Sequence, residues 1–426
     1  MASSLSISVV ICAHTQKRWH ETCAAVASVR AQSLPSREII LVVDHNPELQ
    51  AGLAEALPDV TVVANREARG LSGGKNTGVA LASGDIVAYL DDDAVADQDW
   101  LKYFADSYAD PAVIGVGGRT LPNWLAPRPS WFPDEFAWVV GAAYRGMPET
   151  RAPVRNLLGG NASFRREAFE IAGGFQNGIG RSAAKRPLGC EETEFCIRLS
   201  QRAPGVVFLY DNRAVIWHVV PADRCRFGYF RARCYAEGLS KAQVTASVGA
   251  GDGLATERRY TTRVLPAGVA RGVADAVHGD RAGLGRAGAI VAGVTATAAG
   301  YAAGSIQQYR QQRRLRRAGQ PRRADRPGSA DRLRRGSCPL TRHARPRSDA
   351  TTWPSPQRPP QRDENTRHHA PPTTSGDWRR RWRRRRRRRR PPTGWPVPPP
   401  GRLPLVSPRH GNTSARSCRL RRGPAH

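Results

Sequence analysis

Three consecutive aspartates, Asp91, Asp92 and Asp93, follow an apolar run and are the clearest indication of chemistry in this sequence. On the extended end of a strand, side chains two residues apart point the same way, so Asp91 and Asp93 can share one hard cation while Asp92 points elsewhere. A divalent cation held there would neutralise the charge on a departing diphosphate. Taken alone, the triplet is more simply explained as a solvated acidic turn.

Three further segments carry groups that could act with the triplet. Residues 70–78 form a Gly-rich turn that opens a helix, and the free amides of this turn could face an anion together with Lys75, although the spacing is not that of a Walker motif. Glu191 and Glu192 stand at the start of a predicted helix, where one of them could serve as a base. His218 follows a predicted strand and could complete a metal site through its imidazole.

The elements that must position these groups alternate between strands and helices. Strands are predicted at residues 6–12, 38–43, 59–65 and 85–90, and helices at residues 21–32 and 75–82. Continuous apolar strands separated by helices predict a parallel sheet that is covered on both faces and binds ligands at the carboxyl ends of its strands. The aspartate triplet follows one of these ends.

After residue 100 the pattern is less regular. Strands are predicted at residues 113–119, 157–165, 206–209 and 214–217, and helices at residues 166–172 and 191–201. Residues 124–133, rich in Trp and Pro, predict a lid or an acceptor loop. Residues 287–304 carry no charge, which favours either a membrane-associated helix or a helix packed against the catalytic domain.

The charge is concentrated at one end of the chain. Residues 310–426 contain 34 arginines, no lysine and six acidic residues, which is +28 of the formal net charge of +30. This segment also holds 19 of the 33 prolines and few large aliphatic residues, so we expect it to be disordered. It is either a tail that contacts nucleic acid or an anionic surface, or an out-of-frame translation of a GC-rich gene.

The compartment is indicated by the cysteines and the N-terminus. The eight cysteines form no CxxC pair, and no basic region precedes the first apolar run, so reduced thiols and the absence of a cleaved signal are expected. We therefore expect a cytoplasmic protein, with work at the inner face of the membrane as an alternative.

Five segments, SVVICAHT, EIILVVDHN, RGLSGGKNTGVALASGDIVAYLDDDA, GGNASFRREAF and GCEETEFCIRL, together closely resemble family 2 of the glycosyltransferases. The resemblance covers about residues 5–240 and is most specific at residues 76–93. It implies an α/β fold of the GT-A type, a Rossmann-like and mostly parallel sheet with flanking helices. We expect a catalytic domain at residues 1–245, C-terminal helices at 246–309 that are candidates for membrane association, and the tail at 310–426.

The resemblance also implies roles for single residues. The donor would be bound by Ala13, His14, Thr15, Asp44, Lys75, Asp91 and Asp92, with Lys75 standing where the family usually has Arg. Asp91, Asp93 and His218 would hold the metal. Glu192 falls on the position of the catalytic base in inverting members, but Glu191-Glu192 replaces the usual Glu-Asp, so the assignment between the two stays open. Arg231, Arg233, Tyr235 and Gly238 resemble the basic and aromatic segment that often follows the His.

The function implied is that of an inverting, hexosyltransferase-like enzyme that depends on Mn²⁺ or Mg²⁺. It would transfer a single sugar from a nucleotide sugar, with UDP preferred, to a hydroxyl of a lipid, a glycan or a small metabolite. The QxxRW motif of processive members is absent from the sequence, which argues against long-chain synthesis. The alternatives are a sugar-nucleotide-binding protein that has lost catalysis, and binding of an anionic surface or, less favoured, nucleic acid through the tail.

Overall fold

The computed structural model describes residues 5–179, 188–249 and 258–318. All of them belong to one compact unit, Met1–Gly328, and a second unit comprises Ser329–His426. The predicted disorder after residue 318 lies outside the described residues. The boundary expected at residue 309 falls inside a helix, because α11 runs from Ala282 to Ala318.

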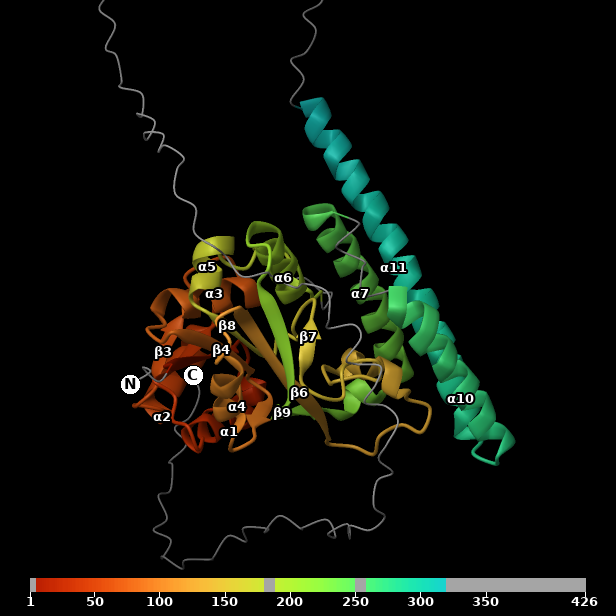
Figure 1. Cartoon of the computed structure of the whole chain (residues 1–426), viewed down its shortest axis with the longest axis horizontal. Helices are drawn as coiled ribbons and strands as arrows, with labels where there is room; N and C mark the ends of the chain where they lie inside the picture. The colour runs from red at the N-terminus through yellow and green to blue at the C-terminus, as the bar shows by residue number, and fades with distance from the viewer. Residues whose placement is uncertain (1–4, 180–187, 250–257, 319–426) are drawn as a thin grey trace, which may run out of the picture. The chain divides into compact units, whose positions relative to one another are not determined.

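The first part of the sheet is parallel, as predicted. It consists of β3 (Thr61–Ala64), β2 (Glu38–Val43), β1 (Ile7–Ala13) and β4 (Ile86–Asp91), in that spatial order (Figure 1). The helices between these strands are α1 (Trp19–Arg30), α2 (Pro47–Ala56) and α3 (Leu71–Leu81). The sequence analysis missed α2, although Asn46 caps it by accepting from the Leu49 amide at 3.1 Å and Pro47 occupies its first turn.

The second part of the sheet, where the sequence pattern is less regular, is mixed. It contains β5 (Ala94–Ala96), β6 (Val113–Trp124), β7 (Ala152–Val154), β8 (Asn161–Arg165) and β9 (Val207–Val220). Strand β8 is antiparallel to both β4 and β6. The two short strands predicted at 206–209 and 214–217 are halves of β9 on either side of a register shift, where Gly118 of β6 pairs with Asp211 and Arg119 pairs with Val215.

Helices cover both faces of the sheet, as predicted. The remaining helices of this region are α4 (Trp100–Ser107), α5 (Glu167–Ala172) and α6 (Glu191–Arg202). One core lies between the sheet and α1, α2 and α4, and the other lies between the sheet and α5 and α6. The predicted α/β class is therefore confirmed, and the mixed sheet with its flanking helices matches the GT-A type.

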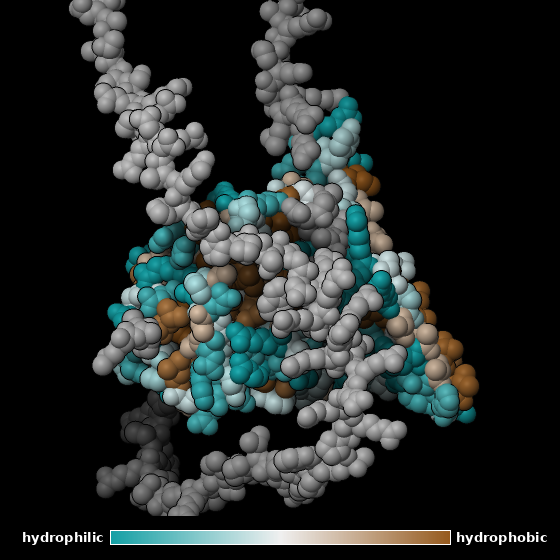
Figure 2. All heavy atoms as spheres, in the orientation of Figure 1, coloured by the Kyte–Doolittle hydropathy of each residue, from teal (hydrophilic) through white to brown (hydrophobic). Residues whose placement is uncertain are grey.

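A third core joins the segment after β6 to the C-terminal helices. These elements are η2 (Asp134–Val140), α7 (Phe227–Val248), η4 (Tyr260–Val264), α10 (Leu265–Val277) and α11. Phe132, Phe136, Phe230 and Ile290 are buried together, so the end of the segment predicted as a lid is anchored in a core. Hydrophobic residues line the outer edge of α10 and α11 (Figure 2).

Helix α11 lies against α7 at backbone distance. A Cβ on Gly238 of α7 would lie 2.1 Å from the Thr297 carbonyl oxygen, and one on Gly300 of α11 would lie 2.0 Å from the Tyr235 carbonyl oxygen. No side chain larger than hydrogen fits at either glycine without moving the helices apart. The α7–α11 pair is therefore held by close packing of small residues over a long contact.

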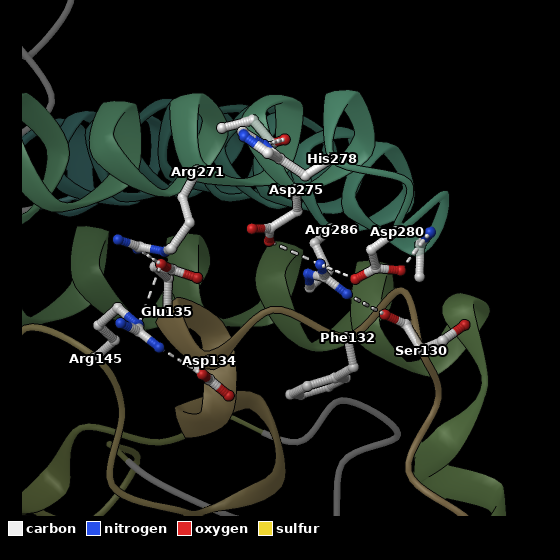
Figure 3. A network of polar contacts seen from close by, with 12 residues as sticks. Ser130, Phe132, Asp134, Glu135, Arg145, Arg271, Asp275, His278, Asp280 and Arg286 are labelled. Carbon is white, nitrogen blue, oxygen red and sulfur yellow. Dashed lines mark hydrogen bonds and ion pairs between the residues drawn. The ribbon is translucent and has the colours of Figure 1, made fainter.

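An ion pair from α10 and a hydrogen bond from α11 link these helices to the segment that contains η2 (Figure 3). Glu135, only 4% exposed, pairs with Arg271 of α10, and Arg145 reaches Asp134 at 2.8 Å. Arg286 of α11 donates to Asp280 at 2.6 Å and to the Ser130 carbonyl at 3.4 Å. Glu135 also lies 3.5 Å from Arg145, so this buried carboxylate is shared between α10 and the segment.

Candidate functional site

The predicted donor residues lie along the carboxyl ends of neighbouring strands. Ala13 of β1 pairs with Val43 of β2, and Cys12 pairs with Asp91 of β4, so these ends are aligned. Ala13 is buried, and its carbonyl accepts from the Asp44 amide at 2.8 Å. The two residues after Ala13 turn outward: the His14 side chain is exposed, and Thr15 caps a short 3-10 turn by accepting from the Lys17 amide at 3.3 Å.

Asp44 fixes the Gly-rich turn beside this edge. Its carboxylate accepts from Asn65 Nδ2 at 2.7 Å and from the Gly70 amide at 3.0 Å, and His45 Nδ1 lies 2.9 Å away. Burial would raise the pKa of Asp44, but these hydrogen bonds outweigh it and lower the pKa. The next residue after Gly70 is Leu71, which lines a cavity described below, so Asp44 links the strand edge to that cavity.

Asp91, Asp93 and His218 come together. Their ligand atoms all lie within 4.8 Å of one another. The antiparallel pairing of β5 with β9 sets Ala94 opposite His218, and His218 Nε2 lies 3.2 Å from Asp93 Oδ1. Two carboxylates and one imidazole form a donor set that suits Mn²⁺ or Mg²⁺. Asp92 is not in this group.

Arg18, which no sequence pattern singled out, contacts both Asp92 and Asp93. Arg18 Nη1 donates to Asp92 Oδ1 at 2.6 Å, and Arg18 Nη2 lies 3.1 Å from Asp93 Oδ2. Burial raises the pKa of Asp92 to about 7, against the opposing charge of Arg18. For Asp93, the hydrogen bond with His218 and the charges of Arg18 and Arg224 outweigh burial and hold the pKa well below its usual range. No local pattern marks Arg18, since only the fold brings it to residues 92 and 93.

The two glutamates have different surroundings. Glu191 is 3% exposed, and its Oε1 lies 2.9 Å from Lys75 Nζ, which is itself 2% exposed. Burial would lower the pKa of Lys75, but the charges of Glu191 and Glu192 outweigh it and raise the pKa. Lys75 therefore faces the glutamates, whereas the sequence analysis expected it to face an anion at the Gly-rich turn; that donor role stays a prediction.

Glu192 lines the cavity and makes no side-chain hydrogen bond or ion pair with another residue in the part of the chain that the structure describes. Burial, and then the charge of Glu191, raise its pKa to about 8. A Cβ on Gly159 would lie 3.0 Å from Glu192 Oε2, and one on Gly160 would lie 2.1 Å from Asp91 Oδ2. Both glycines belong to the segment GGNASFRREAF, and their lack of a side chain lets the backbone approach both carboxylates.

A cavity of about 430 Å³ extends from the strand end at Asp91 and the two glutamates to the C-terminal helices. Asp91, Glu191 and Glu192 belong to its lining. Aromatic and apolar residues make up another part of the lining, called the aromatic wall below: Phe136, Trp138, Tyr144, Tyr260, Leu265, Val294, Ala298 and Tyr301. Sequence reasoning missed this wall because its members come from segments far apart in the chain.

Three charged residues of α7 also line the cavity. Glu237 Oε2 lies 3.2 Å from Arg233 Nη1, and Glu237 Oε1 lies 3.5 Å from Lys241 Nζ. Of the segment resembling the family's basic and aromatic stretch, Arg233 thus reaches the cavity, and Gly238 contacts α11. The cavity offers a half-buried carboxylate of raised pKa, an acidic strand end and a large aromatic wall.

Comparisons with known proteins give a family for this chain. Residues 8–171 match glycosyl transferase family 2. The glucosyl-dolichyl phosphate glucuronosyltransferase of Haloferax volcanii is 35% identical over 242 residues, which are 56% of this chain and 76% of that protein. The succinoglycan biosynthesis protein ExoM of Rhizobium meliloti is 22% identical over 57% of this chain and 76% of that protein. A solved mannosyltransferase from Pyrobaculum calidifontis, in complex with GDP-Man and Mn²⁺, aligns with a TM-score of 0.46 and 18% identity over 70% of this chain and 88% of that one.

Four of the five segments that carried the resemblance lie within the matched residues 8–171. The chain belongs to glycosyl transferase family 2.

Proposed function

We propose that the chain transfers a single sugar from a nucleoside-diphosphate sugar to an acceptor hydroxyl with inversion of configuration. The observation that carries the proposal is that Glu192, with a pKa raised to about 8, lines the same cavity as Asp91. A base and the donor-side strand end then face a common space, which is the arrangement that in-line displacement needs.

Glu192 is the proposed base. Glu191 is committed to Lys75 through a buried ion pair, and taking a proton would break that pair. In the reaction, the acceptor oxygen attacks the anomeric carbon, the bond from that carbon to the diphosphate oxygen breaks, and the hydroxyl proton passes to Glu192. The diphosphate leaves with the bonding electron pair, and Glu192 later returns its proton to solvent. Glu191 and Lys75 position Glu192.

The donor would lie along the strand ends, with its nucleotide near Ala13, His14, Thr15 and Asp44. Asp91, Asp93 and His218 would hold Mn²⁺ or Mg²⁺, which when bound supplies positive charge to the diphosphate. UDP is the preferred nucleotide on the family resemblance. Arg18 keeps Asp93 ionised and oriented.

The proposed acceptor is a lipid-linked sugar. The Haloferax relative is named for an acceptor of this kind, glucosyl-dolichyl phosphate. The aromatic wall of the cavity offers ring faces on which a sugar can pack and an apolar surface for a lipid. A soluble glycan or a small metabolite would leave much of that apolar surface unused. A cytoplasmic enzyme working at the inner face of the membrane is the matching location.

Calorimetry on the full chain tests the donor site. UDP should bind in the presence of Mn²⁺ and lose its affinity with EDTA, and Asp91→Asn/Asp93→Asn should show the loss in both conditions. The matched control is Asp97→Asn, which alters an exposed aspartate directly after β5. Equal UDP binding with and without Mn²⁺ would remove the metal from the proposal.

The remaining candidate is a sugar-nucleotide-binding protein without catalysis, because Glu191-Glu192 departs from the family's usual pair. Turnover of Glu192→Gln equal to that of the unaltered chain would favour this candidate. A large loss of turnover with unchanged UDP affinity supports the transferase.

A further inference from the structure

Helix α11 exposes an apolar face where a helix in water would carry charges. Residues 287–309 contain no charged side chain. Large apolar side chains recur on the exposed face at helical spacing, and the exposed fractions are 60% for Leu284, 55% for Val291, 53% for Ile306 and 59% for Tyr309. Val277 of α10 is 79% exposed. An apolar face of this length indicates a partner that excludes water.

The opposite face of α11 is already occupied. Ala289 and Ile290 are buried in the third core, and Gly300 touches the backbone of α7. Helix α7 in turn carries Arg233 and Glu237 into the cavity. By length and composition, Ala282–Gln311 could cross a membrane, with 28% of its apolar window buried. Crossing would draw α7 and its charges into hydrocarbon, so α11 can meet a bilayer only by lying along its surface.

The charges around the apolar face favour an anionic lipid surface as the partner. Residues 258–313 contain eight arginines and only two aspartates, Asp275 and Asp280. Both aspartates pair with Arg286, at 2.8 Å and 2.6 Å. Arg263, Arg281, Arg310 and Arg313 are exposed at the ends of the two helices. A second copy of the chain would bring these like charges together, whereas anionic headgroups attract them.

The apolar face also adjoins the cavity. Val294, 38% exposed, and Ala298, also exposed, belong to α11 and line the cavity as well. Figure 2, in the orientation of Figure 1, shows hydrophobic residues along the outer edge of α10 and α11. A lipid whose tail stays in the bilayer could therefore place its head in the cavity.

We propose that the exposed apolar face of the α10–α11 hairpin binds an anionic lipid bilayer, with α11 lying along the surface. This hairpin face consists of Val273, Val277, Leu284, Val291, Ile306 and Tyr309. The bilayer then delivers a lipid-borne acceptor to the cavity beside Val294 and Ala298. Delivery rests on the proposed transferase function; the contact with the bilayer does not.

Vesicle flotation of the full chain tests the contact. The vesicles contain phosphatidylcholine and phosphatidylglycerol, and binding is measured at about 0.1 M and about 0.5 M salt, where the screening length falls from about 10 Å to roughly 4 Å. Val291→Glu/Ile306→Glu places two charges on the hairpin face, outside the cavity lining. The matched control is Leu125→Glu, which is 61% exposed and lies in a different region.

At high salt the unaltered chain and Leu125→Glu should still float. The double variant should lose at least about 10-fold in partition coefficient, because two aliphatic side chains no longer enter the bilayer. The proposal is overturned by equal flotation of the double variant, or by full release of the unaltered chain at high salt, which would assign binding to charge alone. A dimer in light scattering that the double variant converts to monomer would assign the face to a second copy.

Two readouts separate this proposal from the transferase proposal. Thermal unfolding and Mn²⁺-dependent UDP binding of the double variant should match those of the unaltered chain, since neither substituted residue touches the strand ends. A chain that floats but transfers no sugar keeps the bilayer contact and removes the catalytic function. A chain that transfers sugar to a soluble acceptor but does not float removes the contact alone.

Discussion

Two regions are built in different ways: the proposed donor edge, formed by the ends of β1, β2 and β4, and the proposed acceptor wall, formed by η2, α7, α10 and α11. At the donor edge, strand register alone brings Ala13, Asp44 and Asp91 into line. The acceptor wall depends on contacts between segments far apart in the chain, such as Glu135 with Arg271. A sheet edge is set by backbone pairing, whereas the wall is set by side-chain fit.

This difference predicts that the two regions fail differently. Substitutions at the donor edge and at the glutamates should change chemistry, metal response or charge balance. Substitutions in the acceptor wall should change packing and acceptor affinity while nucleotide binding persists.

The largest expected effect distinguishes the two glutamates. Glu192→Gln should lower kcat by about 10³-fold, within the range typical of a lost general base, with UDP affinity unchanged. Glu191→Gln should lower the free energy of unfolding by about 3 kcal/mol, because it leaves the buried Lys75 without its charged partner. Steady-state kinetics of both variants measure kcat, and thermal unfolding measures the loss of stability. The reverse pattern would make Glu191 the base.

The pH dependence follows from the raised pKa of Glu192. The base form is populated only above a pKa of about 8, so kcat/KM should fall about tenfold for each pH unit below it and level off above it. The Glu192→Gln variant should lose this limb. A limb of the same shape in the variant would assign the titration to another group.

Stability should respond to the same group in the opposite direction. The pKa in the folded protein, about 8, lies above the ordinary value of 4.5, so ionising Glu192 costs stability progressively as pH rises from about 4.5 through about 8. Glu192→Gln should therefore unfold at a higher temperature than the unaltered chain at pH 8.5 and show no such gain near pH 4. Calorimetric scans at the two pH values measure the difference, and a gain of equal size at both would contradict the linkage.

Arg18 tests how the donor edge balances its charge. Arg18→Gln removes the guanidinium that Asp92 and Asp93 share, leaving only the more distant Arg224 beside Asp93, and should lower the free energy of unfolding by about 3 kcal/mol at neutral pH. Because Mn²⁺ can replace part of the missing charge, it should raise Tm more in this variant than in the unaltered chain. Arg30→Gln, at an exposed pair with Asp59, is the control with little expected effect. Equal Mn²⁺ responses would argue against a cation beside Asp93.

The smallest effects compare two glycines of the C-terminal helices. A Cβ on Gly268 would lie 2.8 Å from both Glu135 Oε1 and Ile290 Cδ1, so Gly268→Ala should destabilise by about 1–3 kcal/mol and raise the KM for acceptor without changing UDP affinity. Gly288 has no atom within 4 Å of its added Cβ, so Gly288→Ala should stabilise by about 0.5–1 kcal/mol. Chemical denaturation measures the stability of both variants, and steady-state kinetics measure the KM for acceptor. Loss of UDP affinity in Gly268→Ala would show that the two regions are coupled.

The sequence by itself determined the elements of the donor edge and the family. Apolar runs of strand length predicted β1, β2 and β4 to within two residues, because a strand buried on both faces must be apolar throughout. The spacing of Asp91 and Asp93 likewise predicted a shared cation, and their ligand atoms lie together with that of His218.

Only the tertiary structure decided the antiparallel direction of β8, the place of Arg18, the partner of Lys75 and the aromatic wall. Each depends on contacts between residues far apart in the chain, such as Lys75 with Glu191, and hydrophobic periodicity gives no information on such pairs. The hairpin face shows both contributions. The uncharged stretch of α11 is visible in the sequence, but which of its sides meets α7 and which stays exposed is decided by the close approach of Gly238 and Gly300 to the facing backbone.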